Sequence, residues 1–379
     1  MNITDVALST ATIQTNDLLN NINAFKNLIA ADTKLMAVVK ADAYSHGAIP
    51  LAREMEAQSA ADYFGVAQLR EALELREAGI QMPILIFNAC RPIEIVYAIQ
   101  QNIAMTVFTP QMAEEIVKVA KTLGKTAVVH LKIDSGMARL GVTTYEAARE
   151  IYDILLSDAV YIEGIFTHFA DAKEDSSDNY THEQFRRFKH ILDLFEADGI
   201  KFDLRHCCNT AGTINFPEYH LDMVRIGLGL YGLNPSVSQQ EKIKLTPIQT
   251  VETTITFIKD FPAGESVGYG RTYTSIEPIR IATVAIGYAD GVAKSLANKG
   301  YFTYKGQRVP ILGEVCMDQI MLDVSEITDI KIGDHVTYFG DPEDGNIQIT
   351  EVARTVAASQ YDLLCRMAPR VKRVYLGNE

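Results

Sequence analysis

The segment MTVFTPQMAEEIVKVAKTLGKTAVVHLKI, residues 105–133, contains the pattern that decides the fold. Its apolar runs at 105–108 and 127–133 have the length and composition of buried strands. Between them, Pro110–Leu123 places apolar residues at helical spacing. Two apolar strands separated by an amphipathic helix are typical of a βα unit in a parallel sheet.

The same alternation of strand and helix recurs on both sides of this segment. Further strands are predicted at 35–39, 63–66, 84–87, 162–167, 202–206 and 223–226, and helices at 68–78, 145–156 and 181–197, among others. About eight such units over roughly 220 residues favour a closed barrel over an open, doubly wound sheet. We therefore predict an α/β fold in which residues 12–236 form a (β/α)8 TIM-type barrel.

The pattern changes near residue 236. Strand-like runs then dominate, at 251–257, 280–286, 301–304, 309–312, 320–324 and 335–339, and one helix is expected from about residue 350 to beyond 364. The opening strand, 6–14, has no obvious barrel partner and is expected to pair with this part. The prediction is a mainly β domain made of residues 1–11 and 237–379.

The composition argues against several classes of protein. A net charge of −13 disfavours general binding to nucleic acid or anionic membranes. No apolar run reaches the roughly 18 residues that a membrane span needs, and no secretory signal is visible, so the cytoplasm is expected. The five cysteines lack CxxC spacing, which suggests neither a disulfide framework nor a metal site.

Lys40 follows the first predicted strand directly. The C-terminal ends of barrel strands are where such folds carry their chemistry. Burial lowers the pKa of an amine, which suits a Schiff base with an aldehyde cofactor. A lysine that extends to the rim of the barrel explains the same residue equally well.

Residues 38–47, VVKADAYSHG, resemble the cofactor-lysine signature of the alanine racemase family. The resemblance covers almost the whole chain. It implies a pyridoxal 5'-phosphate enzyme in which Lys40 bonds the cofactor and Tyr44 lies beside its phosphate. Asp42 and Ser45 stand where the family usually has Asn and Gly. Neither change touches the imine nitrogen, so we treat both as variation that affects substrate choice or rate.

Residues 130–141, HLKIDSGMARLG, resemble the family segment that carries a modified lysine and a substrate-facing arginine. The resemblance implies that Lys132 is carbamylated (N6-carboxylysine) and holds Arg139, which pairs with the substrate carboxylate. A planar guanidinium suits a carboxylate, and a carbamate would anchor it. The alternative is a surface lysine and arginine around a glycine turn.

The next strand ends match the family in order: THFA at 167–170, HCCNTAG at 206–212 and RIGLGLYG at 225–232. The resemblance implies cofactor contacts from His168, Asn209, Thr210 and Arg225. The phosphate site of a barrel lies after its seventh and eighth strands, so backbone donors at Gly227 and Leu228 are also expected to bind the cofactor. Thr210 stands in the usual serine position and keeps the hydroxyl. The last segment spells GxGxxG, but no helix and strand follow it, so a barrel phosphate site explains it better than dinucleotide binding.

By the same resemblance, Arg225 faces the pyridine nitrogen of the cofactor. An arginine cannot accept a proton from that nitrogen, so the ring stays unprotonated and withdraws electrons more weakly. Prompt return of a proton to Cα is then favoured over side reactions such as transamination.

A racemase needs acid–base groups on both faces of a planar intermediate. Lys40 supplies one. Residues 267–273, VGYGRTY, resemble the family segment that bears the second base, which implies Tyr269. A free phenol has a pKa of about 10 and is a poor base at neutral pH. His168, backed by Arg225, is therefore the expected relay. Without the resemblance, Tyr269 would be an aromatic residue in a turn.

Three further segments match the family: GYADG at 287–291, GEVCMDQ at 313–319, and Tyr361 with its neighbour at 362. They imply that Tyr288 narrows the substrate entrance, that Met317 and Asp318 border the substrate, and that Tyr361 contacts the phosphate. The family has Glu after that last tyrosine, where this chain has Asp, and the region needs a short insertion to align. In the family, the β domain completes the active site of the partner subunit, which implies a homodimer.

The resulting hypothesis is interconversion of L- and D-alanine, which supplies D-alanine for peptidoglycan synthesis. Substantial serine activity stays open, because an apolar pocket rejects an added hydroxyl only weakly. A barrel-type decarboxylase of basic amino acids shares the first-strand lysine, but would be expected to place an acid where Arg225 stands. A non-catalytic carrier of the same cofactor would leave the β domain unexplained.

Overall fold

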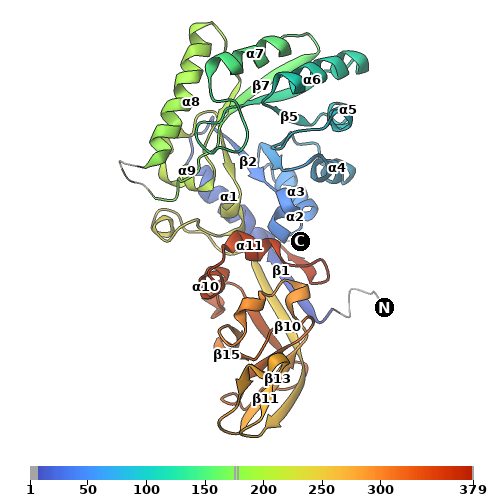
Figure 1. Cartoon of the computed structure of the whole chain (residues 1–379), viewed down its shortest axis with the longest axis vertical. Coiled ribbons are helices and arrows are strands. Elements are labelled where there is room, and N and C mark those ends of the chain that lie inside the picture. Colours follow the sequence, from blue (N-terminus) through green and yellow to red (C-terminus); the bar gives the residue numbers. More distant parts are fainter. Residues whose placement is uncertain (1–6, 175, 177–178, 378–379) are drawn as a thin grey trace. The chain divides into compact units, whose positions relative to one another are not determined.

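The computed structural model describes residues 7–174, 176 and 179–377. The chain divides into two compact units (Figure 1). The barrel unit comprises Leu18–Ala43 and Ala48–Leu245. The β unit comprises the described residues of Met1–Asp17, Tyr44–Gly47 and Thr246–Glu379.

Eight parallel strands form the sheet of the barrel unit, in the order β8-β7-β6-β5-β4-β3-β2-β9. They are β2 Lys34–Val38, β3 Tyr63–Val66, β4 Ile84–Ile86, β5 Ala104–Val107, β6 Ala127–Lys132, β7 Val160–Phe166, β8 Leu204–His206 and β9 Met223–Ile226. Backbone hydrogen bonds from Asp222 N to Arg205 O (3.1 Å) and from Arg225 N to Cys208 O (3.0 Å) join β8 to β9. The predicted barrel is therefore confirmed, with each strand within two residues of its predicted bounds.

Figure 1 shows the helices of this unit arranged around its strands. They are α1 Thr15–Lys26, α3 Ala48–Ala57, α4 Leu69–Glu77, α5 Pro92–Gln100, α6 Pro110–Leu123, α7 Tyr145–Leu155, α8 Tyr180–Ala197 and the short α9 Thr210–Asn215. Local sequence sets both ends of α6. Thr109 caps its first turn by accepting from Met112 N at 3.2 Å, and Gly124 ends it at φ 60°.

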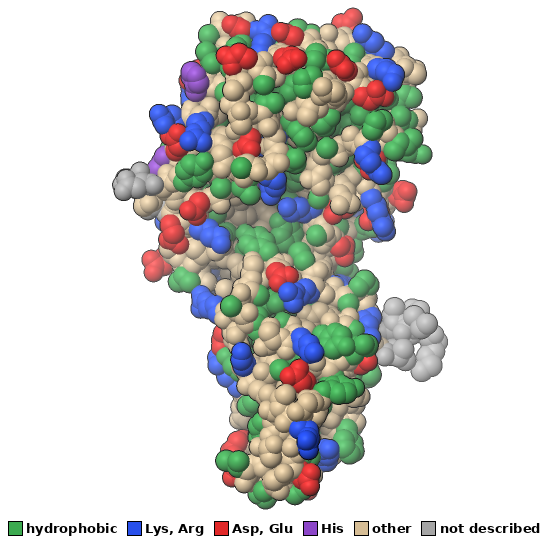
Figure 2. All heavy atoms as spheres, in the orientation of Figure 1, with side chains coloured by type: hydrophobic (Ala, Val, Ile, Leu, Met, Phe, Trp, Pro, Cys, Tyr) green, Lys and Arg blue, Asp and Glu red, His purple; other side chains and the backbone are tan. Residues whose placement is uncertain are grey.

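Side chains fill the interior of the barrel, as the fold requires. One buried cluster consists of Met36, Tyr63, Leu85, Ala104, Phe166, Leu204 and Met223. On the face drawn in Figure 2, acidic and basic side chains are interspersed, without a continuous basic patch. None of the described helices combines the length and apolar character that crossing a membrane requires.

The β unit has an eight-stranded sheet in the order β13-β16-β15-β14-β17-β10-β1-β18, and a small hairpin, β11-β12. The strands are β1 Ser9–Gln14, β10 Gln249–Phe261, β11 Ser266–Val267, β12 Tyr273–Thr274, β13 Ile279–Val284, β14 Tyr301–Tyr304, β15 Gln307–Leu312, β16 Ile320–Asp323, β17 His335–Phe339 and β18 Lys372–Leu376. β1 pairs antiparallel with β10 and parallel with β18. The expected pairing of the opening strand is confirmed, although Val6 lies outside the described residues.

The single helix predicted from residue 350 is wrong. The segment forms two helices, α10 Ile349–Thr355 and α11 Gln360–Cys365. Thr355 is β-branched and a weak helix former, and Ala357 takes a left-handed conformation at φ 51°. Ser359 then caps the new helix by accepting from Tyr361 N at 3.3 Å.

Candidate active site

Lys40 begins a left-handed turn that is separated from the end of β2 by one residue. The segment α2, Lys40–Ser45, has positive φ angles of 52° to 65° at the five consecutive residues 41–45, none of them glycine. A left-handed helical conformation costs L-residues about 1–2 kcal/mol each. Strain of this size persists only where the surroundings enforce it, and it is concentrated at functional sites.

Hydrogen bonds from both units hold this turn. In the barrel unit, Ala41 N donates to Glu71 Oε1 at 2.6 Å, and Asp42 Oδ1 accepts from Ala48 N at 2.7 Å. In the β unit, Arg373 Nε donates to Ser45 O and Tyr375 donates its hydroxyl proton to His46 O, each at 3.0 Å. The position of Lys40 is thus fixed by contacts on its C-terminal side.

The other predicted barrel residues also lie at the C-terminal ends of parallel strands. Lys132 is the last residue of β6, His168 follows β7, Thr210 begins α9 after β8, and Arg225 lies in β9. Because all eight strands are parallel, these ends open on the same mouth of the barrel. The structure therefore brings the barrel residues of the prediction together.

Arg225 is buried at the centre of this group. Its Nη1 donates to His206 Nδ1 at 2.8 Å. Its Nη2 donates to Thr167 O at 2.8 Å, Cys207 O at 3.0 Å and His168 Nδ1 at 3.2 Å. Burial lowers the pKa of Arg225 to about 10, so the guanidinium remains charged at neutral pH. Four acceptors fix both its position and its plane.

A chain of hydrogen bonds extends from Arg225 through the barrel interior. His206 Nε2 lies 3.0 Å from His130 Nδ1, and His130 Nε2 lies 2.8 Å from Glu163 Oε2. Tyr63 donates its hydroxyl proton to the same carboxylate oxygen at 2.9 Å. Since Arg225 can only donate, His206 must carry its proton on Nε2 and His130 must also carry its proton on Nε2.

This chain keeps His206 neutral. Burial and the Arg225 charge hold the pKa of His206 well below its ordinary value. At the far end, burial raises the pKa of Glu163, but the hydrogen bond from His130 brings it below its ordinary value. No role was predicted from the sequence for His206, His130, Glu163 or Tyr63. The spacing in the sequence could have pointed to His130. It precedes Lys132 by two residues, so both side chains lie on the same face of the strand.

His168 is also held neutral. Burial and the Arg225 charge keep the pKa of His168 well below its ordinary value. Because its Nδ1 accepts from Arg225, its Nε2 carries the proton and can donate.

Lys132 is buried among positive charges. Burial, Arg225 and Arg139 together hold the pKa of Lys132 well below its ordinary value. Its Nζ lies 4.3 Å from the centre of the Phe166 ring, and within the described residues this amine makes no hydrogen bond or ion pair. An ammonium group is disfavoured in such surroundings. Arg139 itself is exposed.

The residues after β8 and β9 are tied to one another. Asn209 caps α9, because its Oδ1 accepts from Gly212 N at 3.0 Å and its Nδ2 donates to Phe169 O at 3.3 Å. Thr210 Oγ1 accepts from Gly227 N at 3.0 Å. Leu228 begins a short 3-10 turn, Leu228–Tyr231.

Tyr44 and Tyr361 meet in the β unit, although more than 300 residues separate them in sequence. Their ring centres are 6.1 Å apart, at an angle of 45°. Burial raises the pKa of Tyr361 to about 12 and raises the pKa of Tyr44 further. Both phenols are therefore protonated at neutral pH and can donate hydrogen bonds to an anion.

The remaining predicted residues of the β unit face solvent in the single chain. The side chains of Tyr269, Met317 and Tyr288 are 75%, 52% and 42% exposed. Tyr269 lies in a turn between Gly268 at φ 69° and Gly270 at φ 68°. Within the described part of the chain, its hydroxyl makes no hydrogen bond.

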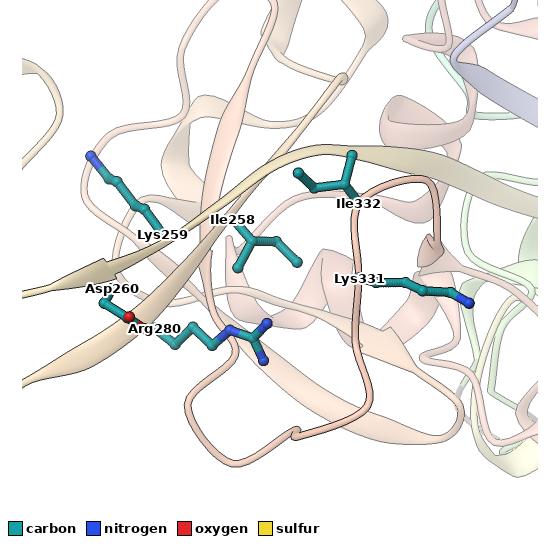
Figure 3. A pocket seen from close by; sticks show the side chains of 6 residues that line it. All are labelled: Ile258, Lys259, Asp260, Arg280, Lys331 and Ile332. Carbon is teal, nitrogen blue, oxygen red and sulfur yellow. The ribbon is translucent and has the colours of Figure 1, made fainter.

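A separate pocket in the β unit contains none of the predicted site residues (Figure 3). It is lined by Ile258, Lys259, Asp260, Arg280, Lys331 and Ile332. Figure 3 shows the Lys259 and Lys331 side chains pointing away from each other. These two lysines therefore do not converge on a common ligand in this pocket.

Comparison with known proteins decides the family. Residues 13–235 match the family model described as alanine racemase, N-terminal domain, and residues 248–375 match the model of the C-terminal domain. The chain belongs to the alanine racemase family. Both the resemblance inferred from the sequence motifs and the predicted fold are thereby confirmed.

Named alanine racemases resemble the chain over nearly its whole length. Alanine racemase 1 of Oceanobacillus iheyensis is 42% identical over 360 residues, which cover 95% of this chain and 96% of that protein. The alanine racemase of Desulforamulus reducens is 40% identical over 369 residues, covering 97% and 98%. The solved alanine racemase of Clostridium difficile 630 has a TM-score of 0.94 and 37% identity, covering 98% and 97%. That of Bacillus anthracis with bound L-Ala-P has a TM-score of 0.91 and 33% identity, covering 98% and 95%.

Asp42, where the alanine racemase family usually has Asn, acts as a cap in this chain, because it binds the backbone N–H of Ala48 at the start of α3. We expect Asp42→Ala to lower the free energy of unfolding by about 1 kcal/mol, since that N–H loses its partner. Asp42→Asn keeps an oxygen acceptor and serves as the control. Urea unfolding measures both, and equal loss in the two variants would show that charge matters rather than the cap.

Proposed function

We propose that this member of the alanine racemase family interconverts L- and D-alanine by moving a proton at Cα between two bases. Lys40 acts on one face of the substrate and Tyr269 on the other. The observation that carries the proposal is Arg225. It is a buried, charged guanidinium held by four acceptors, in the strand that pairs with the strand preceding Lys40.

The residues present fit pyridoxal 5'-phosphate. When bound, this cofactor supplies an aldehyde for covalent attachment and a ring that withdraws electrons from Cα. Lys40 offers the amine, and the protonated phenols of Tyr44 and Tyr361 offer donors for a phosphate. We propose that the cofactor is held by Lys40, Tyr44, His168, Asn209, Thr210, Arg225, Gly227, Leu228 and Tyr361.

Arg225 sets the electronic character of the site. It can only donate hydrogen bonds, so it would hold the ring nitrogen of the cofactor as an acceptor without a proton. The chain through His206, His130 and Glu163 fixes the guanidinium and gives each histidine one tautomer. Held in this way by Arg225, the cofactor would withdraw electrons only moderately, which would favour return of the proton to Cα over transamination.

His168 is proposed to activate Tyr269. Its Nδ1 accepts from Arg225, so its Nε2–H is available to donate. A hydrogen bond from this group to the Tyr269 oxygen would stabilise the phenolate and lower the barrier to proton abstraction. Lys40 would exchange the proton on the opposite face of the substrate.

The substrate carboxylate is proposed to pair with Arg139. Carbamylation would turn Lys132 from an amine among cations into an anion that pairs with Arg139 and Arg225. Met317 and Asp318 would border the substrate, and Tyr288 would narrow the entrance.

The exposure of Tyr269, Tyr288 and Met317 supports a homodimer in which they act, together with Asp318, on the partner's barrel. We propose residues 12–236 as the cofactor-binding barrel domain, and 1–11 with 237–379 as the domain that carries the second base. We further propose that the enzyme works in the cytoplasm and supplies D-alanine for peptidoglycan.

Incubation of the enzyme with L-alanine in deuterated water tests the reaction. We expect D-alanine carrying deuterium at Cα, identified by chiral chromatography and mass spectrometry. A decarboxylated amine would favour the decarboxylase, and no exchange with cofactor still bound would favour the carrier. Serine in the same assay measures how strongly the pocket rejects the added hydroxyl.

The neutral histidines predict how stability depends on pH. The folded protein keeps His206 and His168 unprotonated, whereas an unfolded histidine binds a proton below about pH 6.5. The unfolded state then binds more protons, so stability falls as pH drops, by up to about 1.4 kcal/mol per pH unit for each such histidine. Urea unfolding at pH 7 and 5.5 measures the loss.

His206→Leu should remove one of these contributions and make the pH dependence shallower. It should also lower stability at pH 7 by about 1–3 kcal/mol, because Arg225 and His130 each lose a partner. His182→Leu is the matched control, since the His182 ring bonds to the Tyr219 hydroxyl at 2.8 Å and takes no part in the chain from Arg225 to Glu163. An unchanged pH dependence in His206→Leu would contradict the neutral state of that ring.

A further inference from the structure

Two loops of the β unit carry the residues proposed to border the substrate. The first, 287–291, contains Tyr288, and the second, 313–319, contains Met317 and Asp318. Their backbones are joined, because Tyr288 N donates to Cys316 O and Ala289 N donates to Met317 O, each at 3.0 Å. The two loops therefore form one continuous edge of the β unit.

The loops approach closely at Gly287. A Cβ atom at that position would lie 2.3 Å from Met317 O and 2.4 Å from Cys316 O, so no larger residue fits there. Contact as tight as this leaves the edge sensitive to small movements of either loop.

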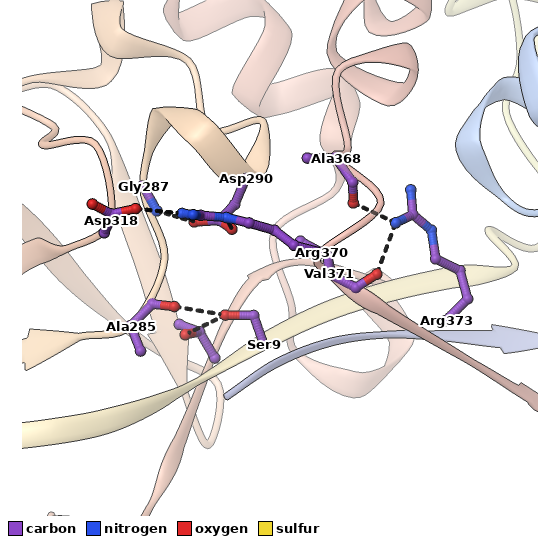
Figure 4. Close-up of polar contacts among 10 residues, drawn as sticks. Ser9, Ala285, Gly287, Asp290, Asp318, Ala368, Arg370, Val371 and Arg373 are labelled. Carbon is purple, nitrogen blue, oxygen red and sulfur yellow. Dashed lines mark hydrogen bonds and ion pairs between the residues drawn. The ribbon is translucent and has the colours of Figure 1, made fainter. Parts of the chain in front are cut away.

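One side chain from a third segment bridges both loops. Arg370 donates from Nε to Asp290 Oδ1 and from Nη2 to Asp290 Oδ2, the latter at 3.0 Å. The same Nη2 donates to Asp318 Oδ1 at 2.7 Å. Figure 4 shows the Arg370 side chain between these two carboxylates. Arg370 precedes β18, so it joins the edge to the β-sheet.

The two ion pairs differ in kind. Asp290 is buried, and its Oδ2 also accepts from Gly287 N at 2.7 Å while its backbone O accepts from Ala368 N at 3.0 Å. A buried carboxylate needs a counter-charge, so the Asp290 pair anchors the first loop. Asp318 is 60% exposed on its side chain, and an exposed pair adds little to global stability. Its effect is local, because it fixes where the second loop lies.

We propose that Arg370 is a positioning residue that holds the Tyr288 loop and the Met317–Asp318 loop at one spacing, and thereby limits the size of the substrate side chain. The inference rests on the proposed alanine racemase function and deepens it. In this role Arg370 acts through its contacts with Asp290 and Asp318. Loss of the bridge frees the loops to separate, which admits larger side chains and weakens the fit to alanine.

The test compares the holoenzyme with Arg370→Gln and Asp318→Asn in racemisation of alanine and of 2-aminobutyrate. One methylene is worth about 10- to 200-fold in selectivity in a fitted pocket. Misplacement of substrate-bordering groups costs up to about 100-fold in rate. We expect Arg370→Gln to raise KM for alanine more than it lowers kcat, and to reduce the preference for alanine over 2-aminobutyrate by about ten-fold.

Asp318→Asn should reproduce the loss of preference without a change in melting temperature, because the ion pair that it weakens is exposed. Arg370→Lys should restore part of it. Arg308→Gln is the matched control, since this exposed arginine pairs with Glu351, outside both loops. Hydrogen exchange gives a readout independent of activity: the amides of Tyr288 and Ala289 should exchange faster in Arg370→Gln than in Arg308→Gln.

Unchanged preference and unchanged exchange in a folded Arg370→Gln enzyme would overturn the inference. A lower melting temperature with unchanged preference would do so as well, since Arg370 would then be structural only. If the wild-type enzyme does not racemise alanine, the proposed function fails instead, and the exchange measurement still reports whether Arg370 holds the loops.

Discussion

Replacing Lys40 by alanine is expected to abolish the covalent link to pyridoxal 5'-phosphate and to lower kcat for alanine by at least about 100- to 10,000-fold. Lys40 is the amine at the end of β2 and the proposed base on one face of the substrate. The change should leave the left-handed turn intact, because the positive φ angles belong to residues 41–45. Borohydride reduction followed by intact-mass measurement reports the link, and chiral analysis of the product reports the rate.

Lys34→Ala is the matched control for this experiment. Lys34 is the exposed first residue of the same strand, so its loss should change neither the link nor the rate. If reduction added the same mass to Lys40→Ala as to the wild-type enzyme, the cofactor would be attached to another lysine. The proposed role of Lys40 would then be wrong.

Tyr269→Phe is expected to keep the cofactor bound and to lower racemisation by about 100- to 10,000-fold, because only the hydroxyl is removed. The loss of Cα proton exchange should affect one enantiomer only. In deuterated water, D-alanine should still exchange its Cα proton through Lys40 but should not yield L-alanine. L-alanine should lose its proton far more slowly than with the wild-type enzyme.

Tyr273→Phe controls for the change of residue type, since Tyr273 lies in the same segment but in the small hairpin strand β12. Its product formation should match the wild-type enzyme. If Tyr269→Phe exchanged both enantiomers at the normal rate, tyrosine would have no part in the proton transfer.

Local patterns made most of the fold predictable. The strands at 63–66 and 223–226 and the helix Pro110–Leu123 match their predicted bounds, because buried apolar runs and amphipathic spacing are properties of contiguous sequence. β18, Lys372–Leu376, was not predicted. Its sequence KRVYL begins with two charges, and it is a strand because it pairs in parallel with β1, more than 350 residues away.

The candidate site, like the fold, was predictable only in part. The positions of Lys40, His168 and Arg225 follow from parallel topology, which places strand ends together. The chain of hydrogen bonds from Arg225 to Glu163 depends on which interior side chains of β6, β7, β8 and β9 meet across the barrel. The sequence alone does not give the register of these strands. The left-handed turn was equally hidden, because none of its five residues is the glycine that usually marks a positive φ.

Mixing the two inactive variants tests most directly whether Lys40 and Tyr269 of different subunits share one site. After subunit exchange between Lys40→Ala and Tyr269→Phe, half of the dimers should be mixed, and each should contain one site with both groups intact. We predict recovery of about a quarter of wild-type alanine racemisation. If mixed dimers form but the mixture is as inactive as each variant alone, the result would contradict a site shared between subunits.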